Sequence, residues 1–109
     1  MSIKALYRKE IAYITKHIKE QYKPDKIILF GSCATGNIKP SSDIDMFIIK
    51  QSKKRRVDRI KDVLLKIDNN LPFEPLVYTP DEVKERIELG DFFIQDILKK
   101  GRILYEKKQ

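Results

Sequence analysis

Two aspartates separated by a single residue are the feature of this sequence that most directly indicates chemistry. Asp43 and Asp45 open an apolar run that continues to Ile49, so a strand starting there directs both carboxylates to one face. Carboxylates this close repel each other unless a cation compensates them. Mg²⁺ suits such a pair, because it binds few carboxylates and completes its shell with water and substrate phosphates. An isolated Asp-x-Asp also fits a structural interpretation, with Ser42 or Asp43 capping a turn and Asp45 on a solvated face.

A Gly-Ser pair upstream of the aspartates favours the metal-binding interpretation of Asp43 and Asp45 over the structural one. Gly31 and Ser32 come directly after the apolar run Lys26–Phe30 and precede a loop rich in Gly, Ser, Thr, Asn and Pro. Glycine lets the backbone approach a ligand closely, and free N–H groups at the start of a helix bind anions. In the structural alternative, Gly31 only shapes the turn and Ser32 caps a helix. A phosphate site and a metal site joined by one loop, however, are what a metal-bound nucleoside triphosphate requires.

These motifs resemble the signature of the DNA polymerase β-like nucleotidyltransferases, in which Gly-Ser is followed by ten residues and then Asp-x-Asp. The matching residues are Gly31-Ser32, the ten residues from Cys33 to Ser42, and Asp43-Ile44-Asp45. The phrase from Ser42 to Met46 is similar to the minimal nucleotidyltransferases of bacteria and archaea, and the similarity extends through residues 76–82 and 101–106. The compound motif is specific, so chance similarity is a poor explanation for it.

The resemblance implies a role for each motif residue and for one further carboxylate. The implied nucleotide-binding residues are Gly31, Ser32 and Ser42, and the implied catalytic and metal-binding residues are Asp43, Asp45 and Glu74. Two Mg²⁺ ions and ATP as the substrate are implied with them.

Two departures from the family pattern stand out. Relatives often have Asp where this chain has Glu74, and many carry Arg in the turn that here contains Cys33 and Thr35. A plain surface glutamate at a strand start remains the alternative for Glu74.

Short strands and amphipathic helices must position these residues. Apolar periodicity predicts helices over residues 3–22, 56–69, 80–89 and 92–100, and strands over 26–30, 44–50, 73–78 and 102–105. The apolar stripes of the first two helices are Ile3, Tyr7, Ile11, Ile14 and Ile18, and Val57, Ile60, Leu64 and Ile67. We therefore expect an α/β (α+β) domain over residues 1–109, with a small mixed sheet packed with helices in the polymerase β-like nucleotidyltransferase fold.

Five residues give more specific predictions about how these elements begin and end. Pro75 removes a ladder donor and predicts an edge position or a bulge for its strand. Thr79 and Glu82 form the sequence pattern of a capping box ahead of the third helix. Asp91 is expected to cap the last helix, and Gly101, directly after that helix, predicts a left-handed cap.

The charge of the chain is concentrated in one segment. The net charge is +7, and residues 50–61 contain seven basic residues and one acidic residue. This basic segment has three interpretations: a solvated helix start, contact with phosphates of a nucleotide or nucleic acid, and docking of an acidic protein.

The lone Cys33 excludes a disulfide scaffold and is expected to be a packing residue. No run approaches the ~20 apolar residues of a membrane span and no signal peptide is evident, so we expect a cytoplasmic protein without a membrane partner.

The resemblance also implies a reaction and a partner. The expected reaction transfers a nucleoside monophosphate, AMP from ATP, to a hydroxyl acceptor. Larger members carry a helical domain that holds the acceptor, and this chain of 109 residues has none, so a partner is expected to supply it. Minimal members are commonly paired with helical HEPN-domain toxins and act as antitoxins that adenylylate a tyrosine of the toxin. A catalytically weak module that neutralises its partner by complex formation is the alternative, and a basic nucleic-acid-binding domain is a third.

Overall fold

Five helices and four strands make up the computed structural model, which describes residues 1–108. The helices are α1 (Ile3–Gln21), α2 (Ser32–Thr35), α3 (Arg56–Lys66), α4 (Pro80–Glu88) and α5 (Phe92–Lys100). The strands are β1 (Lys26–Phe30), β2 (Ile44–Ile49), β3 (Phe73–Tyr78) and β4 (Arg102–Glu106). The expected mixed α/β architecture is confirmed, and the bounds of β1, β3 and α5 agree with the sequence prediction.

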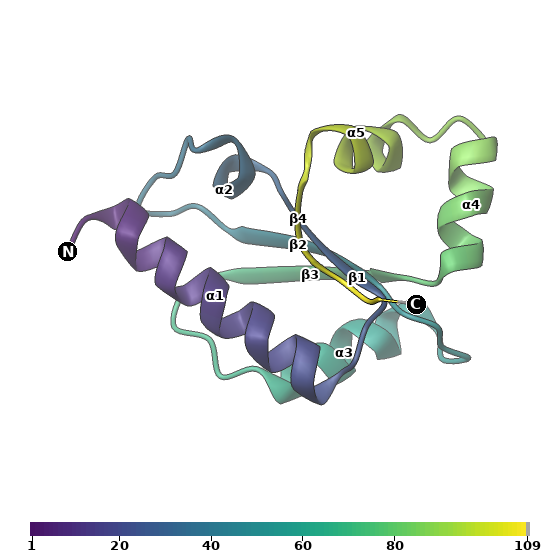
Figure 1. Cartoon of the computed structure of the whole chain (residues 1–109), viewed down its shortest axis with the longest axis horizontal. Coiled ribbons are helices and arrows are strands. Elements are labelled where there is room, and N and C mark those ends of the chain that lie inside the picture. Colours follow the sequence, from purple (N-terminus) through teal and green to yellow (C-terminus); the bar gives the residue numbers. More distant parts are fainter. Residues whose placement is uncertain (109) are drawn as a thin grey trace.

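The four strands form one mixed sheet in the order β3-β2-β1-β4. Strand β1 pairs antiparallel with β2 and β4, whereas β2 and β3 run parallel. Helices α1 and α3 cover one face of the sheet, and α4 and α5 lie on the other (Figure 1). Because β1 ends where β2 and β3 begin, the segments that follow β1 and precede β2 and β3 meet at one end of the sheet.

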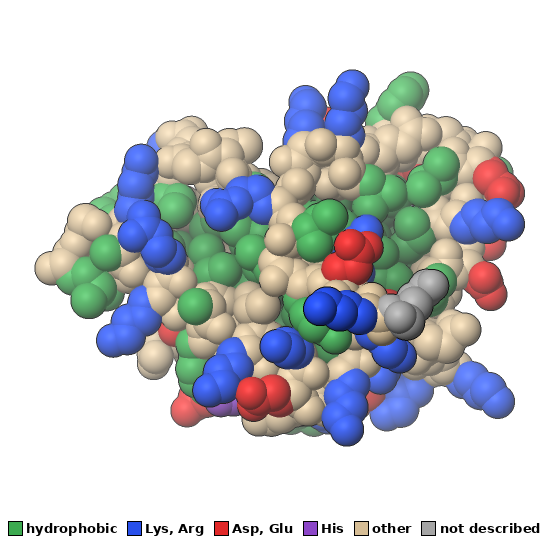
Figure 2. Space-filling model, viewed as in Figure 1, with side chains coloured by type: hydrophobic (Ala, Val, Ile, Leu, Met, Phe, Trp, Pro, Cys, Tyr) green, Lys and Arg blue, Asp and Glu red, His purple; other side chains and the backbone are tan. Residues whose placement is uncertain are grey.

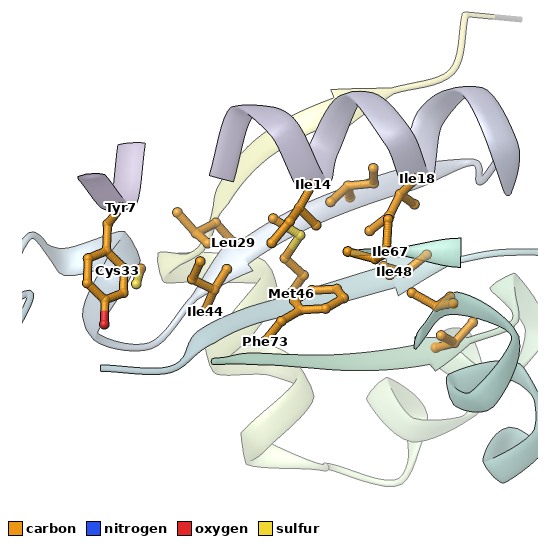
Figure 3. Close-up of a cluster of buried hydrophobic side chains, with 13 residues drawn as sticks. Tyr7, Ile14, Ile18, Leu29, Cys33, Ile44, Met46, Ile48, Ile67 and Phe73 are labelled. Carbon is orange, nitrogen blue, oxygen red and sulfur yellow. The ribbon is translucent and has the colours of Figure 1, made fainter. Parts of the chain in front are cut away.

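Alternating side chains of the central strands fill two separate apolar cores. The larger core lies under α1 and α3, and Figure 3 shows Ile14 and Ile18 of α1 above Met46 and Ile48 of β2. The smaller core lies under α4 and α5 and contains Phe47 of β2. Since both faces of β2 are buried, its apolar residues run continuously from Met46 to Ile49, and Asp45 is the acidic exception within the strand.

Three local predictions are confirmed. Pro75 lies in β3, an edge strand of the sheet, where its missing N–H costs no ladder hydrogen bond. Thr79 caps α4 through the backbone N–H of Glu82, and the Glu82 carboxylate accepts from the Thr79 backbone N–H, which completes the capping box. Asp91 caps α5 through the N–H of Ile94.

The left-handed cap predicted at Gly101 is wrong. Gly101 has φ −68° and ψ 163°, an extended conformation that any residue adopts. The reason for a glycine is space, because a Cβ there would lie 2.4 Å from the carbonyl oxygen of Ile97 and 2.5 Å from Cγ2 of Ile28. The absent side chain therefore allows the end of α5 to approach β1 closely.

The predicted inner face of α3 is also partly wrong. Val57 is 61% exposed and Leu64 is 42% exposed, whereas Arg59, Val63 and Ile67 are buried. The helix is rotated because the Arg59 guanidinium binds inside the protein, to the carbonyl oxygens of Lys54 and Val77 and to the Glu82 carboxylate. The helix also ends at Lys66 rather than at residue 69.

The stripe predicted for α1 is confirmed apart from its first residue. Tyr7, Ile14 and Ile18 are buried and Ile11 is partly buried, whereas Ile3 is exposed at the helix start. None of the helices within residues 1–108 has the length and apolar character needed to cross a membrane.

Candidate functional site

The carboxylates singled out in the sequence meet at one end of the sheet. Asp45 pairs in register with Phe30 of β1 on one side and with Glu74 of β3 on the other. Asp43 lies two residues before Asp45, in the segment that leads into β2. The sheet thus brings together Asp43, Asp45 and Glu74 from positions up to 31 residues apart in the chain.

The electrostatics of Asp45 show how close this acidic grouping is. Burial, and then the negative charges of Glu74 and Asp43, raise the pKa of Asp45 to about 6. Asp45 is half-buried, whereas Asp43 and Glu74 are exposed. A carboxylate in this position carries unfavourable charge at neutral pH, and a bound cation would relieve it.

Gly31 lies directly against the Asp45 carboxylate. It has φ 74° and ψ −157°, and a Cβ built on it would lie 2.5 Å from Oδ2 of Asp45. Gly31 also caps α2 without a side-chain hydrogen bond, so the turn keeps its backbone open where β1 ends. Ser32 is the first residue of α2 and does not occupy the cap position, which argues against the structural alternative in which it caps this helix. The geometry permits a ligand to approach Gly31 and Asp45 together.

The loop between Gly31 and Asp43 is held from behind by two buried side chains. The Tyr7 hydroxyl of α1 donates to the carbonyl oxygen of Ser42 at 2.7 Å and to that of Pro40 at 3.3 Å. The Cys33 thiol donates to the carbonyl oxygen of Asp43 at 3.3 Å. Figure 3 shows the Tyr7 ring and Cys33 next to each other. These contacts fix the backbone that carries Asp43.

Cys33 has the packing role expected for it. Its side chain is buried, and burial together with the charge of Asp45 raises the pKa of its thiol. A thiol of this kind stays protonated at neutral pH and is a poor nucleophile.

Ser42 stabilises the same loop, because its hydroxyl oxygen accepts a hydrogen bond from the Lys39 backbone N–H at 2.8 Å. Its expected nucleotide contact stays a prediction.

The donor set fits Mg²⁺ as a partial site. Asp43, Asp45 and Glu74 offer hard carboxylate oxygens, and the raised pKa of Asp45 marks a charge that a cation would stabilise. Within residues 1–108, however, no three His, Cys, Asp or Glu side chains are gathered closely enough to enclose a metal ion by themselves. Mg²⁺ would therefore need further oxygens from water and substrate phosphates, which is the coordination that this ion prefers.

A hollow beside Gly31 extends the site toward α5. This cavity of about 450 Å³ is lined on one side by Phe30, Gly31, Ala34 and Thr35, and on the other by Phe93, Asp96, Ile97, Lys100 and Gly101. Phe93 is 53% exposed, and its ring meets that of Phe30 edge-on at 5.9 Å. The motifs of the sequence did not predict this cavity. The available signal was the Phe92-Phe93 pair at the start of α5, since successive helix residues point about 100° apart and two large aromatic rings there extend beyond the centre of the buried stripe.

The basic segment over residues 50–61 is largely occupied by internal partners. Lys54 pairs with Asp62, Arg55 with Asp58, and Arg59 with Glu82. Arg56 lies over the ring of Tyr78 and Lys50 over that of Tyr22. These contacts favour the interpretation as a solvated helix start with structural ion pairs.

Comparison with known proteins shows the family. The family model described as polymerase beta, nucleotidyltransferase matches residues 12–109, which include Gly31, Ser32 and the three carboxylates. The chain belongs to the polymerase beta nucleotidyltransferase family. Nucleotidyl transfer is the general activity that this membership supports, and the resemblance inferred from Gly31-Ser32 and Asp43-Ile44-Asp45 is confirmed at the level of the family.

A solved structure supports the fold of this nucleotidyltransferase domain. The crystal structure of a candidate nucleotidyltransferase from Sulfolobus solfataricus is similar, with a TM-score of 0.55 and 19% sequence identity. The similarity covers 96% of this chain and 81% of that chain, and at this identity it bears on the fold alone. No curated protein sequence matches the chain.

Proposed function

We propose that this nucleotidyltransferase transfers AMP from Mg²⁺-bound ATP to a hydroxyl group of a partner protein. The expected acceptor is a tyrosine of a helical HEPN-domain toxin, which would make the chain an antitoxin of the cytoplasm. The observation that carries the proposal is the contact between Gly31 and Asp45, with Glu74 and Asp43 close enough to raise the pKa of Asp45. This contact brings a backbone suited to phosphate next to carboxylates suited to Mg²⁺.

The residues of the chain have distinct roles in the proposed reaction. Gly31 and Ser32 bind the triphosphate, with the Ser32 hydroxyl as a donor to a phosphate oxygen. Asp43, Asp45 and Glu74 would hold Mg²⁺, which supplies positive charge at the triphosphate and makes an acceptor hydroxyl more acidic. Tyr7 and Cys33 keep the Asp43 loop in place.

The bond changes follow from in-line transfer. The acceptor oxygen forms a bond to the α-phosphorus of ATP, the bond from that phosphorus to the bridging oxygen of the β-phosphate breaks, and pyrophosphate leaves. The proton of the acceptor hydroxyl passes to the Glu74 carboxylate where Glu74 is not bound to the metal, and otherwise to solvent water, which reaches the exposed start of β3. The acceptor hydroxyl must therefore reach the end of the sheet from outside.

Two features support adenosine nucleotides and a protein acceptor. The cavity beside Gly31 has aromatic rings at Phe30 and Phe93 against which a nucleobase could pack, and the Asp96 carboxylate, which pairs with Lys100, could also accept a hydrogen bond from an exocyclic amine such as that of adenine. The carboxylates Asp43 and Glu74 are exposed, which suits an acceptor presented by a second protein. The HEPN partner and the tyrosine rest on the resemblance described for the sequence.

The test combines the chain with ATP labelled in the α-phosphate, Mg²⁺ and the product of the neighbouring gene. The expected result is label on that protein and a mass increase of one AMP on a tyrosine. The variants Asp43→Asn and Asp45→Asn should lose the transfer, whereas Asp81→Asn, an exposed aspartate in α4 after the opposite end of β3, should retain it. A tight complex without any transfer by the native chain would instead support the alternative, a binding module that neutralises its partner.

A further inference from the structure

A second cavity lies behind the loop that carries the nucleotidyltransferase motif. It has a volume of about 320 Å³ and lies between α1, the loop after α2, and strands β1 and β4. Its apolar lining consists of Ile11, Leu29, Cys33, Ile38 and Leu104, and its polar lining consists of Lys4, Arg8 and Arg102. Figure 2 shows apolar atoms in a hollow between α1 and β4 with Lys and Arg side chains around it. We call this hollow the α1–β4 cavity.

The charge around the α1–β4 cavity is positive only. Lys4 and Arg8 come from α1 and Arg102 comes from β4, and no acidic side chain lines the cavity. Within residues 1–108, none of these three cations forms a salt bridge, although six other cations of the chain do. Cations from two separate elements that converge on one hollow without a counter-charge create a positive potential that attracts an anion.

We propose that the α1–β4 cavity binds an organic anion with an aliphatic body. The apolar lining has aliphatic side chains and a thiol but no aromatic ring, so it offers no surface for stacking a nucleobase. Its volume lies in the range of small-ligand sites, about 300–1,000 Å³. Arg8 and Arg102 can each bind a carboxylate or a phosphate through two parallel hydrogen bonds. The aliphatic body would lie against Leu29 and Leu104, with the anionic group toward the cations.

The cavity is separate from the predicted nucleotide site but touches the same loop. Cys33 lines the cavity and donates to the carbonyl oxygen of Asp43, and Ile38 lies between the Gly-Ser pair and the aspartates. A ligand there contacts the side of the loop opposite to the carboxylates. Neither Asp45 nor Glu74 lines the cavity, so binding there can be measured without Mg²⁺ or ATP.

The experiment measures binding of simple probes to the full chain by calorimetry and by backbone NMR. Hexanoate and hexyl phosphate combine charge with an aliphatic body and distinguish the two headgroups. Inorganic phosphate lacks the body, hexan-1-ol lacks the charge, and hexylamine has the opposite charge. We expect at least one of the two organic anions to bind saturably, about tenfold or more tightly than the three control probes, with shifts at Ile11, Ile38 and Leu104.

Variants connect the binding to the two arginines. Arg8→Gln and Arg102→Gln should each weaken binding of the preferred anion about tenfold. Lys16→Gln, an exposed change on the same helix outside the cavity, should leave it unchanged. Absence of saturable binding by both organic anions, equal binding of hexan-1-ol, or full binding by the Arg8→Gln/Arg102→Gln double variant would overturn the proposal. Each of these outcomes is independent of nucleotidyl transfer, which is measured separately.

Discussion

The Asp45 carboxylate occupies the space that a side chain on Gly31 would need, with Oδ2 only 2.5 Å from the position of a Cβ. The contact joins the end of β1 to the start of β2, where the two halves of the motif meet. It explains why glycine is required at this position beyond its φ of 74°. The phosphate-binding turn and the carboxylates are therefore parts of one structure.

Replacing Gly31 with alanine should damage both stability and nucleotide binding. The Gly31→Ala variant combines a positive φ with a collision at Asp45. We therefore expect its free energy of unfolding to fall by more than about 1 kcal/mol. We also expect it to bind no detectable Mg²⁺–ATP. Gly36→Ala is the matched control, since Gly36 has φ 85° and no atom within 4 Å of its Cβ position. Thermal unfolding and calorimetric titration check both. Equal ATP affinity in the two variants would contradict the assignment of Gly31.

Removing the Tyr7 hydroxyl should loosen the Asp43 loop without unfolding the protein. Tyr7→Phe loses the hydrogen bonds to the Ser42 and Pro40 carbonyl oxygens, worth about 1 kcal/mol. We expect faster amide hydrogen exchange at residues 39–44 and a weaker apparent affinity for Mn²⁺ used as a probe for Mg²⁺. Tyr13→Phe, on the same helix, should change neither quantity. Unchanged exchange at residues 39–44 in Tyr7→Phe would show that the loop does not depend on this hydroxyl.

Replacing Phe93 should weaken the binding of ATP more than it slows the chemical step. Phe93→Ala removes an aromatic wall of the cavity beside Gly31, so we expect a KM for ATP raised about tenfold with kcat changed little. Phe92 is 83% exposed and does not line this cavity, and Phe92→Ala should leave both constants unchanged. Steady-state kinetics with varied ATP separate the two effects. A fall in kcat at an unchanged KM would contradict a role in nucleotide binding.

The pair of Arg59 and Glu82 should make stability depend on pH in the acid range. The hydrogen bond from Arg59 holds the pKa of Glu82 below its ordinary 4.5. The unfolded chain then binds more protons than the folded chain, so stability is fully present above pH 4.5 and falls as the pH drops through the folded pKa of Glu82.

The Glu82→Gln variant isolates this contribution. At pH 7 it should be less stable than the native chain by roughly 1–3 kcal/mol, and the difference should shrink as the pH falls below 4.5. Glu88→Gln, an exposed change on the same helix, is the control. Urea unfolding at a series of pH values measures the effect. A difference that stays constant down to pH 3 would show that the charge of Glu82 does not contribute in this way.

Local sequence signals predicted the elements well because their ends are marked chemically. The Thr79–Glu82 capping box, Asp91 and the Gly31-Ser32 turn each act over three or four residues, which the sequence shows directly. The spacing of Asp43 and Asp45 predicted that these two carboxylates lie together, whereas the addition of Glu74 was predictable only through the family resemblance, since it depends on strand register.

Contacts between distant residues account for what the sequence could not predict. The prediction of the inner face of α3 was partly wrong because Arg59 is buried in an ion pair with Glu82, which is 23 residues away in the chain. The hydrogen bond from the Tyr7 hydroxyl to the Ser42 carbonyl oxygen joins residues 35 apart, so no local pattern in the sequence predicts it. Gly101 looked like a conformational glycine, whereas its requirement comes from lack of space beside the Ile97 carbonyl oxygen and beside Ile28 of β1, 73 residues away in the chain.

The most direct test of the central claim compares ATP labelled in the α-phosphate with ATP labelled in the γ-phosphate. The native chain, given Mg²⁺ and its partner, should transfer the α-label and release the γ-label as pyrophosphate, and Asp43→Asn/Asp45→Asn should transfer neither. Transfer of the γ-label, or transfer of the α-label that survives in the double variant, would contradict a nucleotidyl transfer carried by these two aspartates.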